Sequence, residues 1–336
     1  MQKLKAAVIG LGRIASLLDE DTLREKPCTH AGAIAANGDC VLVAGCDIDE
    51  ERRRLFAEKW NKQGLEVSVY EDACEMLNIH KPDILSIATH PDSHYRYCRL
   101  AASYSVPVVI CEKPLADNIR EARKISKLAQ ESNTVIITNH ERRYSQDYIN
   151  AKSILDEEKL GRLLGVRACL YMGKTTRLVD ALWHDGTHLA DAIMFLTSLK
   201  LKHKRRSGAK LTSRNGTAWL EGELRGDKSA TPVPVLMEIG AGRDHLVFEI
   251  EFSCEKGRLR IGNGVFEVWE SVPSPYAEKF RSLQNTGAEF RGHTGYFANM
   301  LMDAVSCAKD PQNAPVSTAA DGLCVIEYLN SVKRWR

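Results

Sequence analysis

The chain has 336 residues, of which 44% are hydrophobic and 27% are charged, and its formal net charge is +2. This balance is typical of a globular protein with about two domains and excludes a largely disordered chain. It also gives no reason to expect a nucleic-acid or anionic-membrane partner.

The cellular setting is predicted from cysteines and apolar runs. The ten cysteines are scattered without zinc-ligand spacing, which favours reduced cysteines used as small core residues. The apolar run that ends at Gly10 is too short for a signal peptide, and no later stretch has the length and apolarity of a membrane span. We therefore expect a cytoplasmic protein.

The first 140 residues alternate short apolar runs with amphipathic segments. Strands separated by helices, several of them nearly continuous in Val and Ile, predict a parallel sheet covered on both faces, as in a doubly wound Rossmann domain. The expected strands are Ala6–Ile9, Val41–Cys46, Val67–Tyr70, Ile84–Ala88, Val108–Cys111 and Val135–Thr138. The expected helices are Glu50–Trp60, Ala73–Leu77, Ser93–Ser103 and Ile119–Ser132.

After Tyr144 the pattern changes to β-rich segments without regular intervening helices, which favours an α+β domain with a large, mostly antiparallel open sheet. The expected strands are Leu163–Met172, Thr217–Leu224, Val233–Ile239, Leu246–Ser253, Arg258–Ile261 and Val265–Glu270. The expected helices are Gln146–Glu157, Leu182–Leu196, Tyr296–Ala308 and Thr318–Lys333, and the basic run Lys200–Arg206 is interpreted as a solvated loop. The predicted domains are 1–140 for dinucleotide binding, 141–315 for substrate binding and oligomerisation, and 316–336 as a C-terminal helix that packs back on the first domain.

A glycine motif follows the first predicted strand. Gly10, Gly12, Arg13, Ile14 and Ala15 fit G-x-G-x-x-(G/A). In this context the first glycine allows a tight turn, the second lets the backbone approach a pyrophosphate, and the following helix supplies amides to the anion. The motif predicts a dinucleotide site.

Asp47 closes the second strand, where a carboxylate accepts hydrogen bonds from the adenosine ribose and would repel a 2′-phosphate. NAD is therefore favoured over NADP, although Arg52, Arg53 and Arg54 keep NADP open. The spacing from the glycines exceeds the usual one of about 20 residues. A polar insertion at 17–27, after which the helix resumes at His30, would explain the excess.

Glu112-Lys113-Pro114 follows the fifth strand, at the sheet edge where ligands of such folds bind. A lysine there could act as acid or base toward a substrate oxygen, and Pro114 could be cis. A surface lysine that happens to follow a strand is the simpler alternative.

These motifs together resemble the Gfo/Idh/MocA family of glucose–fructose oxidoreductase, inositol dehydrogenase and rhizopine-catabolism proteins. The resemblance also covers Ala88–His94 after the fourth strand, Asn139–Tyr144 after the sixth and Gly186–Asp191 further on, so it extends by motif from residue 6 to about residue 195.

The resemblance implies site residues. Lys113 and His188 match the family's catalytic lysine and histidine, and Thr89, Pro91 and His94 match the loop that lines the cofactor. Glu112 and Lys113 are also expected to contact the cofactor. Arg142 and Arg143 match positions near the nicotinamide and substrate, and Trp183 could stack on a sugar ring or serve as a buried anchor.

One departure lies four residues before His188, where the family usually has aspartate and this chain has His184. On one helix the two histidines would share a face, so His184 could orient His188 or contact the substrate. Asp185 or Asp180 could instead orient His188. Two histidines at this spacing with Asp185 also suggest a metal, but the resemblance explains the cluster without one, so no metal is expected.

The implied function is an NAD(P)-dependent dehydrogenase or reductase that acts on CH–OH groups of a sugar, sugar derivative or cyclic polyol. Two alternatives stay open. The chain could be a cofactor-cycling enzyme with tightly bound NAD, such as an epimerase or glycosidase, or a dinucleotide-binding regulator without catalysis. The expected partners are a small-molecule substrate and further copies of the chain, as a homodimer or homotetramer.

Overall fold

A computed structural model describes residues 3–174, 176–226, 231–287 and 292–334 of the chain. Contacts divide the chain into two compact units. The first contains Met1–Ser145 and His293–Ile326, and the second contains Gln146–Gly292 and Glu327–Arg336. Of the helices within the described ranges, none combines the length and the apolar character that crossing a membrane would require.

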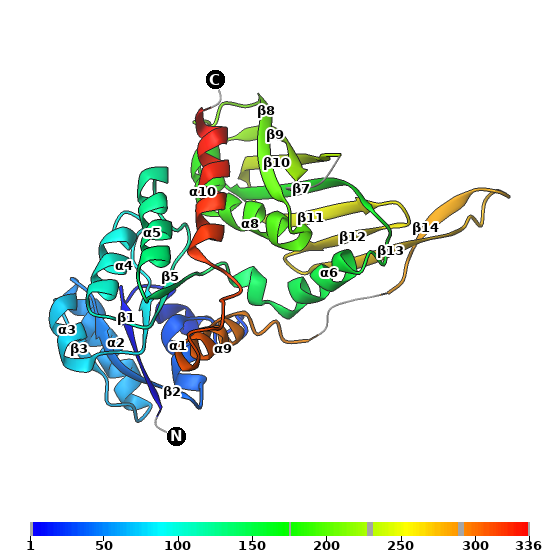
Figure 1. The fold of residues 1–336 in the computed structure, drawn as a ribbon. Helices are drawn as coiled ribbons and strands as arrows, with labels where there is room; N and C mark the ends of the chain where they lie inside the picture. Colours follow the sequence, from blue (N-terminus) through cyan, green and yellow to red (C-terminus); the bar gives the residue numbers. More distant parts are fainter. Residues whose placement is uncertain (1–2, 175, 227–230, 288–291, 335–336) are drawn as a thin grey trace. The chain divides into compact units, whose positions relative to one another are not determined.

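The first unit is built on a six-stranded parallel sheet with the order β3-β2-β1-β4-β5-β6 (Figure 1). Its central strands are almost wholly buried, because helices cover both faces of a parallel sheet, whereas the edge strand β3 is partly exposed. The predicted Rossmann fold is thereby confirmed. The strands are β1 (Leu4–Ile9), β2 (Cys40–Cys46), β3 (Ser68–Tyr70), β4 (Ile84–Ile87), β5 (Val108–Cys111) and β6 (Val135–Thr138).

Several helices of this unit begin at a side-chain cap. Asp49, Asp72 and Asn118 each accept hydrogen bonds from backbone amides in the first turn of the helix that follows, which satisfies donors that a helix leaves unpaired. The helices are α1 (His30–Ala36), α2 (Glu50–Lys62), α3 (Ala73–His80), α4 (His94–Ser103), α5 (Ile119–Glu131) and α9 (Tyr296–Lys309), with the 3₁₀ turns η1 (Leu17–Glu20) and η2 (Glu141–Tyr144).

Helix α9 belongs to the first unit, although the sequence interpretation left it in the range 141–315. Phe297 is 1% exposed in the core of this unit. The Tyr144 hydroxyl donates to Asp303 at 2.8 Å, and the Asn299 amide donates to the Tyr144 carbonyl at 2.9 Å. A long-range pairing of this kind leaves no signal in the local sequence, which is why the boundary differs.

The second unit is built on an eight-stranded sheet with the order β14-β13-β12-β11-β7-β10-β9-β8. Every neighbouring pair is antiparallel except β7 and β10, which confirms the mostly antiparallel sheet. The strands are β7 (Leu163–Gly173), β8 (Lys200–Gly208), β9 (Gly216–Arg225), β10 (Val233–Arg243), β11 (Val247–Cys254), β12 (Gly257–Gly262), β13 (Val265–Pro273) and β14 (Arg281–Asn285).

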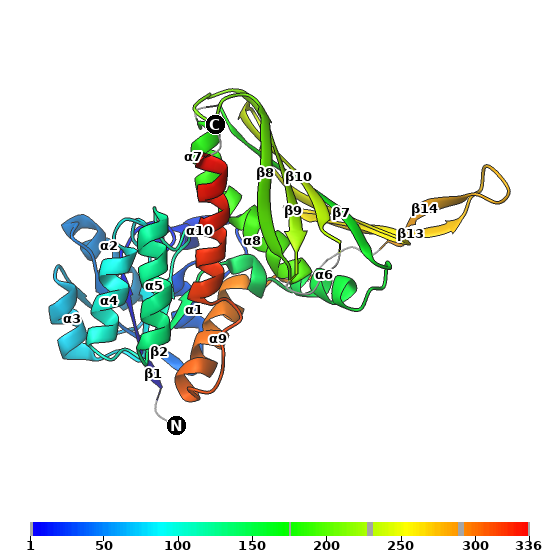
Figure 2. The same ribbon diagram turned by 45° about the horizontal axis from the view of Figure 1, so that its top comes forward.

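One face of this sheet packs against helices and the other carries polar side chains. Helices α6 (Gln146–Asp156), α7 (Leu178–His184) and α8 (Gly186–Thr197) contact the sheet, and Figures 1 and 2 show α6 and α8 on the same side of it. Alternate residues of β11 are buried beneath them, and the residues between are partly exposed. This alternation is the pattern of a half-buried strand.

The basic run was predicted as a loop, and this prediction is wrong because it forms the edge strand β8. Leu201 is 4% exposed, and the strand pairs with β9, whose acidic side chains neutralise the basic ones. Lys204 pairs with Glu223, and Arg205 lies 3.6 Å from Glu221. Charged side chains on an edge strand also discourage pairing with other chains.

The C-terminal helix α10 (Ala319–Arg334) contributes to both units. In the first unit, the Thr138 hydroxyl donates to the Thr318 carbonyl at 3.0 Å just before the helix begins. In the second unit, the Tyr328 hydroxyl contacts the Met237 sulfur at 3.1 Å. Residues 335–336 of the segment predicted as 316–336 lie outside the described residues.

Candidate active site

The glycine turn of the first unit has the geometry that its sequence predicts. Gly10 adopts a positive φ of 85° and its amide donates to the Cys46 carbonyl at 2.8 Å. A Cβ at Gly10 would lie 2.8 Å from the backbone of Ala88, so no larger residue fits. A Cβ at Gly12 would meet only the guanidinium of Arg52, at 4.0 Å. The backbone of Gly12 is therefore open to the close approach that a pyrophosphate requires.

An excursion of the chain separates the glycine turn from helix α1. The amides of His30 and Ala31 donate to the carbonyls of Ile14 and Ala15, at 3.2 and 2.9 Å. Residues 17–29 thus leave the turn that follows the motif, and the chain returns beside that turn where α1 begins. The polar insertion expected from the sequence is confirmed, and without these thirteen residues Asp47 would follow Gly10 by 24 positions instead of 37.

Asp47 is 7% exposed and lies beside the glycine turn. One carboxylate oxygen accepts the Leu11 amide at 2.7 Å and the other accepts the Asp49 amide at 3.0 Å. The Arg52 guanidinium, which is about half exposed, lies 3.7 Å from the first oxygen. A carboxylate oxygen accepts more than one hydrogen bond, so capacity for ribose hydroxyls remains.

The loop after β4 lies against the glycine turn, since a Cβ at Gly10 would also meet the side chain of Thr89. Pro91 is half-buried within it. His94, at the start of α4, is completely buried, and its ring nitrogens lie 3.1 Å from the Thr89 carbonyl and 3.2 Å from the Leu115 carbonyl. Burial lowers the pKa of His94, although both carbonyls oppose that effect. His94 therefore shapes this loop from within the protein.

Glu112, Lys113 and Pro114 follow β5 at the same edge of the sheet. Lys113 is half-buried and its peptide bond to Pro114 is cis, as the sequence interpretation allowed. Glu112 is 6% exposed. Its Oε1 accepts a hydrogen bond from the Asn139 amide and lies 2.8 Å from Nε2 of His30, and its Oε2 accepts the Lys113 amide at 3.1 Å.

The ionisation of Glu112 follows from these contacts. Burial alone would raise the pKa of its carboxyl. The hydrogen bond and charge of His30, followed by the hydrogen bond of Asn139 and the charge of Lys113, outweigh burial and bring that pKa below its usual value. Glu112 is accordingly an anion at neutral pH.

The 3₁₀ turn η2 follows β6, which pairs with β5 so that Thr138 lies beside Cys111. Arg142 is half-buried there. Arg143 is 7% exposed, and its guanidinium donates to the Val316 carbonyl at 3.1 Å and lies 3.2 Å from Asp321. Arg143 therefore anchors the segment that precedes α10.

Glu141 lies in the same turn and was not singled out from the sequence. Burial raises the pKa of its carboxyl, and the positive charges of Lys113 and Arg142 oppose that rise. Glu141 is thus an acidic group in the electrostatic surroundings of Lys113. The strand register could have indicated it, since residues that follow neighbouring parallel strands emerge at one edge.

His184 and His188 were predicted to share one helix, and this is wrong. Helix α7 ends at His184 and α8 begins at Gly186. Two local features accompany this break between the helices. The Thr187 hydroxyl donates to the His184 carbonyl at 2.8 Å, and Gly186 has the low helix propensity of any glycine. The His184 side chain is 75% exposed, whereas His188 is 7% exposed in the first turn of α8.

The acidic residues around this junction differ in their contacts. Asp185 lies 3.6 Å from the His184 ring. Asp180 forms two hydrogen bonds with Arg177, at 2.6 and 2.7 Å. These bonds hold the pKa of Asp180 below its usual value. Asp191, one turn after His188, is 1% exposed and was not named as a site residue from the sequence. Residues at i and i+3 are neighbours on a helix, so Asp191 is a further candidate to orient His188.

Trp183 is half-buried beside the C-terminal helix, and the Lys333 ammonium lies 5.4 Å from its ring centroid. A cation over one ring face fits a packing role. Within the described ranges, no group of three or more His, Cys, Asp or Glu side chains is arranged to hold a metal ion.

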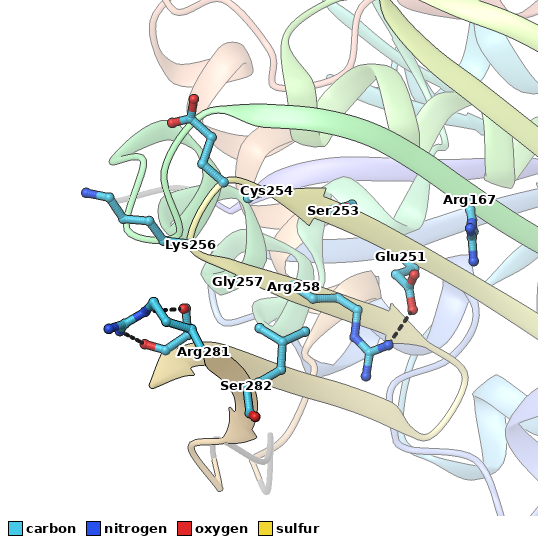
Figure 3. A pocket seen from close by; sticks show the side chains of 12 residues that line it. Arg167, Glu251, Ser253, Cys254, Lys256, Gly257, Arg258, Arg281 and Ser282 are labelled. Atoms are coloured by element: carbon cyan, nitrogen blue, oxygen red, sulfur yellow. Dashed lines mark hydrogen bonds and ion pairs between the residues drawn. The ribbon is translucent and has the colours of Figure 1, made fainter. Parts of the chain in front are cut away.

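The second unit also contains a hollow of about 370 Å³ on the polar side of its sheet (Figure 3). Arg258 pairs with Glu251 at 3.3 Å, and Arg281 donates to Ser271 at 2.7 and 2.8 Å. The hollow is lined by none of the predicted catalytic residues.

Comparison with known proteins agrees with the fold. Residues 4–140 match the model of the Gfo/Idh/MocA family, described as an oxidoreductase family with an NAD-binding Rossmann fold. The chain is 25% identical over 263 residues to inositol 2-dehydrogenase of Salmonella typhimurium strain LT2, which covers 76% of this chain and 69% of that protein. It is 26% identical over 204 residues to D-glucoside 3-dehydrogenase of Escherichia coli K12, which covers 57% of this chain and 54% of that protein.

Among solved structures, the chain resembles myo-inositol 2-dehydrogenase from Lactobacillus plantarum. The TM-score is 0.72 and the identity is 20%, with 99% of this chain and 97% of that chain covered. At this identity the likeness concerns the fold, and it extends across both units.

Proposed function

We propose that the chain is an oxidoreductase of the Gfo/Idh/MocA family, whose model matches residues 4–140, and that it transfers hydride between a nicotinamide dinucleotide and a carbon of a sugar, sugar derivative or cyclic polyol. The relatives named inositol 2-dehydrogenase and D-glucoside 3-dehydrogenase support this substrate class. The observation that carries the proposal is the carboxyl edge of the six-stranded sheet, which holds the glycine turn, Asp47 and Lys113 in one unit.

The dinucleotide would be held by the chain's own backbone and by one carboxylate. The open backbone at Gly12 and the amides of Arg13 and Ile14 suit a pyrophosphate, and Thr89 and Pro91 would border it. Asp47 would accept the ribose hydroxyls. When bound, the nicotinamide would supply the hydride acceptor or donor.

Lys113 would exchange a proton with the reacting hydroxyl or carbonyl oxygen. Its half-buried position beside charged groups suits an acid–base role. His188 would be the second proton-handling group, because it is the buried histidine of the α7–α8 junction. Asp185 or Asp191 would orient its ring, and Arg142 would contact the substrate.

NAD is the proposed cofactor, because a 2′-phosphate beside the Asp47 carboxylate would meet like charge. Arg52 weakens this preference, since its guanidinium lies 3.7 Å from the same carboxylate and would attract that phosphate. We expect NADP to be accepted poorly rather than excluded.

A homodimer or homotetramer is proposed from the polar side of the eight-stranded sheet. Trp219 and Leu236 are each 40% exposed on strands β9 and β10, and apolar side chains exposed together favour association. Light scattering after size-exclusion chromatography would test this, and a single species of 37.5 kDa would contradict it.

The full-length protein should be assayed for NADH formation with inositols, aldoses, glucosides and sugar acids, with NADP⁺ in parallel. Turnover with NAD⁺ is expected for at least one polyol or sugar. Tightly bound nicotinamide without net NADH release would favour a cofactor-cycling enzyme. If dinucleotide binds but no compound turns over, and Lys113→Ala keeps all binding, the chain would be a regulator.

A further inference from the structure

Three buried polar side chains meet beneath Lys113, and they come from distant parts of the chain. His30 begins α1, Glu112 follows β5 and Asn139 follows β6. Their exposed fractions are 1%, 6% and 0%. His30 and Asn139 both contact the same oxygen of Glu112. Because buried polar groups are costly unless paired, such a cluster must be held by its mutual contacts.

The carboxylate of Glu112 is directed toward groups of the protein itself. An ionised carboxylate only accepts hydrogen bonds, and its two oxygens already receive His30, Asn139 and the Lys113 amide. Its side chain is 8% exposed. A contact of Glu112 with the cofactor stays a prediction, and its contacts in the structure are with the interior and with the backbone of its own turn.

His30 is fixed by contacts on several sides. Its amide donates to the Ile14 carbonyl at 3.2 Å, and Thr29 before it accepts the Gly32 amide at 3.0 Å as the helix cap. The ring of Phe297 meets the imidazole edge-on, with centroids 5.3 Å apart. Nδ1 of His30 makes no hydrogen bond with the described residues. The polar contact of the ring is therefore the one to Glu112.

The Glu112 carboxylate acts on Lys113 through the main chain. It accepts the amide of Lys113, the residue directly after it, and so closes a tight local ring. Any rotation of the Glu112 side chain would release that amide and change the direction in which the lysine leaves the strand. A displacement of about 1 Å is enough to cost a catalytic group much of its rate.

We propose that His30 and Asn139 are positioning residues that fix the direction of Lys113 by immobilising the Glu112 carboxylate. The rate consequence rests on the proposed function, whereas the fixed direction of the lysine does not. The excursion at 17–29 then has a use, since it returns the chain to the helix with His30 at the required place.

The test compares two replacements of one residue in the full-length protein. His30→Leu removes the ring donor at similar size, and His30→Gln keeps an N–H that can reach Glu112. His80→Leu is the matched control, because His80 also makes a single 2.8 Å contact, to the Tyr70 hydroxyl, in the same unit. Measured quantities are kcat, the KM for NAD⁺, the Kd for NADH and the rate at which acetic anhydride modifies Lys113 in the cofactor-free protein.

We expect His30→Leu to lower kcat about 10- to 100-fold and to speed Lys113 modification about threefold or more, because a lysine released from its turn reaches solvent more often. The KM for NAD⁺ and the Kd for NADH should stay unchanged. His30→Gln should bring kcat and the Lys113 modification rate most of the way back to the native values. His80→Leu should match the native protein in both. If His30→Leu does not fold, Asn139→Leu tests the same carboxylate.

The proposal is overturned if His30→Leu leaves the modification rate of Lys113 at the native value, or if His30→Gln is as impaired as His30→Leu. The modification assay needs neither substrate nor cofactor. A native protein that turns over no compound would therefore refute the proposed function. The positioning role of His30 would still be decided by the modification rate of Lys113.

Discussion

Lys113 and His188 are the two side chains proposed to exchange protons, and they lie in different kinds of local structure. Lys113 follows a buried parallel strand, and the groups around it come from residues 30, 139 and 141. His188 starts a helix, and the polar groups identified near it lie within a few residues along the chain. A strand end gathers distant segments, whereas a helix junction depends on local geometry.

The comparison shows why the two sites were predictable to different degrees. The position of Lys113 follows from fold type alone, because ligands of parallel sheets bind at the carboxyl edge. The orientation of His188 depends on whether one helix continues through Asp185 or two helices meet there. In the structure α7 ends at His184 and α8 begins at Gly186, and this local break is not visible in the apolar pattern.

The largest expected effect is at Lys113. Lys113→Met removes the ammonium but keeps the apolar stem, and kcat should fall by about 10³-fold, within the range for losing a general acid or base. The Kd for NADH, measured by fluorescence, should change less than about threefold, because the glycine turn and Asp47 are untouched. A kcat above one tenth of the native value would remove Lys113 from the chemistry.

Replacement of the two histidines of the junction should have very different effects on kcat. His188→Leu should lower kcat by about 10²-fold, whereas His184→Leu should leave it within about threefold, since the His184 side chain is 75% exposed. Steady-state kinetics and thermal melts of both variants check this. Equal losses would mean that exposure does not distinguish their roles.

Asp47 offers a smaller effect on the cofactor side. Asp47→Ser should raise the KM for NAD⁺ about 10-fold and lower that for NADP⁺, because a like charge beside the phosphate is removed. Arg52→Ala is the matched variant and should weaken NADP⁺ only. If the preference for NAD⁺ over NADP⁺ is unchanged in both variants, the adenosine ribose does not bind beside Asp47.

The smallest expected effect is a pH dependence of stability at Glu141. Burial raises the pKa of this carboxyl in the folded state above its usual value of 4.5. The contribution of Glu141 to folding stability is therefore favourable below the pKa of the unfolded chain and is lost as pH rises through the pKa of the folded protein. Glu141→Gln should therefore raise the melting temperature by a few degrees at most at neutral pH, with no gain at pH 4. A gain that is the same at both pH values would contradict a titrating Glu141.

Much of the fold could be predicted from residue patterns. Short apolar runs, several of them nearly continuous in Val and Ile, predicted all six parallel strands, and β-rich segments predicted six strands of the second sheet, because each pattern reflects which faces are buried. The run at 200–206 was missed because its charges conceal the alternation of Leu201 and His203, and only the acidic strand beside it makes a strand favourable. The hairpin strand β14 has mostly exposed polar residues and gave no pattern.

The site was predictable in its motifs and not in its contacts. The glycine turn, Asp47 and the Glu112–Pro114 segment lie where the motif implies. The pairing of Glu112 with His30 spans 82 residues, and Arg143 proved to anchor Val316. Such partners follow from three-dimensional packing, which no local pattern encodes.

The excursion at residues 17–29 has a practical consequence for protein engineering. Its two ends are joined by hydrogen bonds from the amides of His30 and Ala31 to the carbonyls of Ile14 and Ala15. Between them Glu25 accepts hydrogen bonds from Thr294 and Gly295, whereas Leu23 is 95% exposed, so added residues are best placed at Leu23. Lengthening such a loop costs free energy only with the logarithm of its length. A fluorophore or affinity peptide spliced between its anchored ends would report from beside the nucleotide end of the domain without changing the domain's architecture.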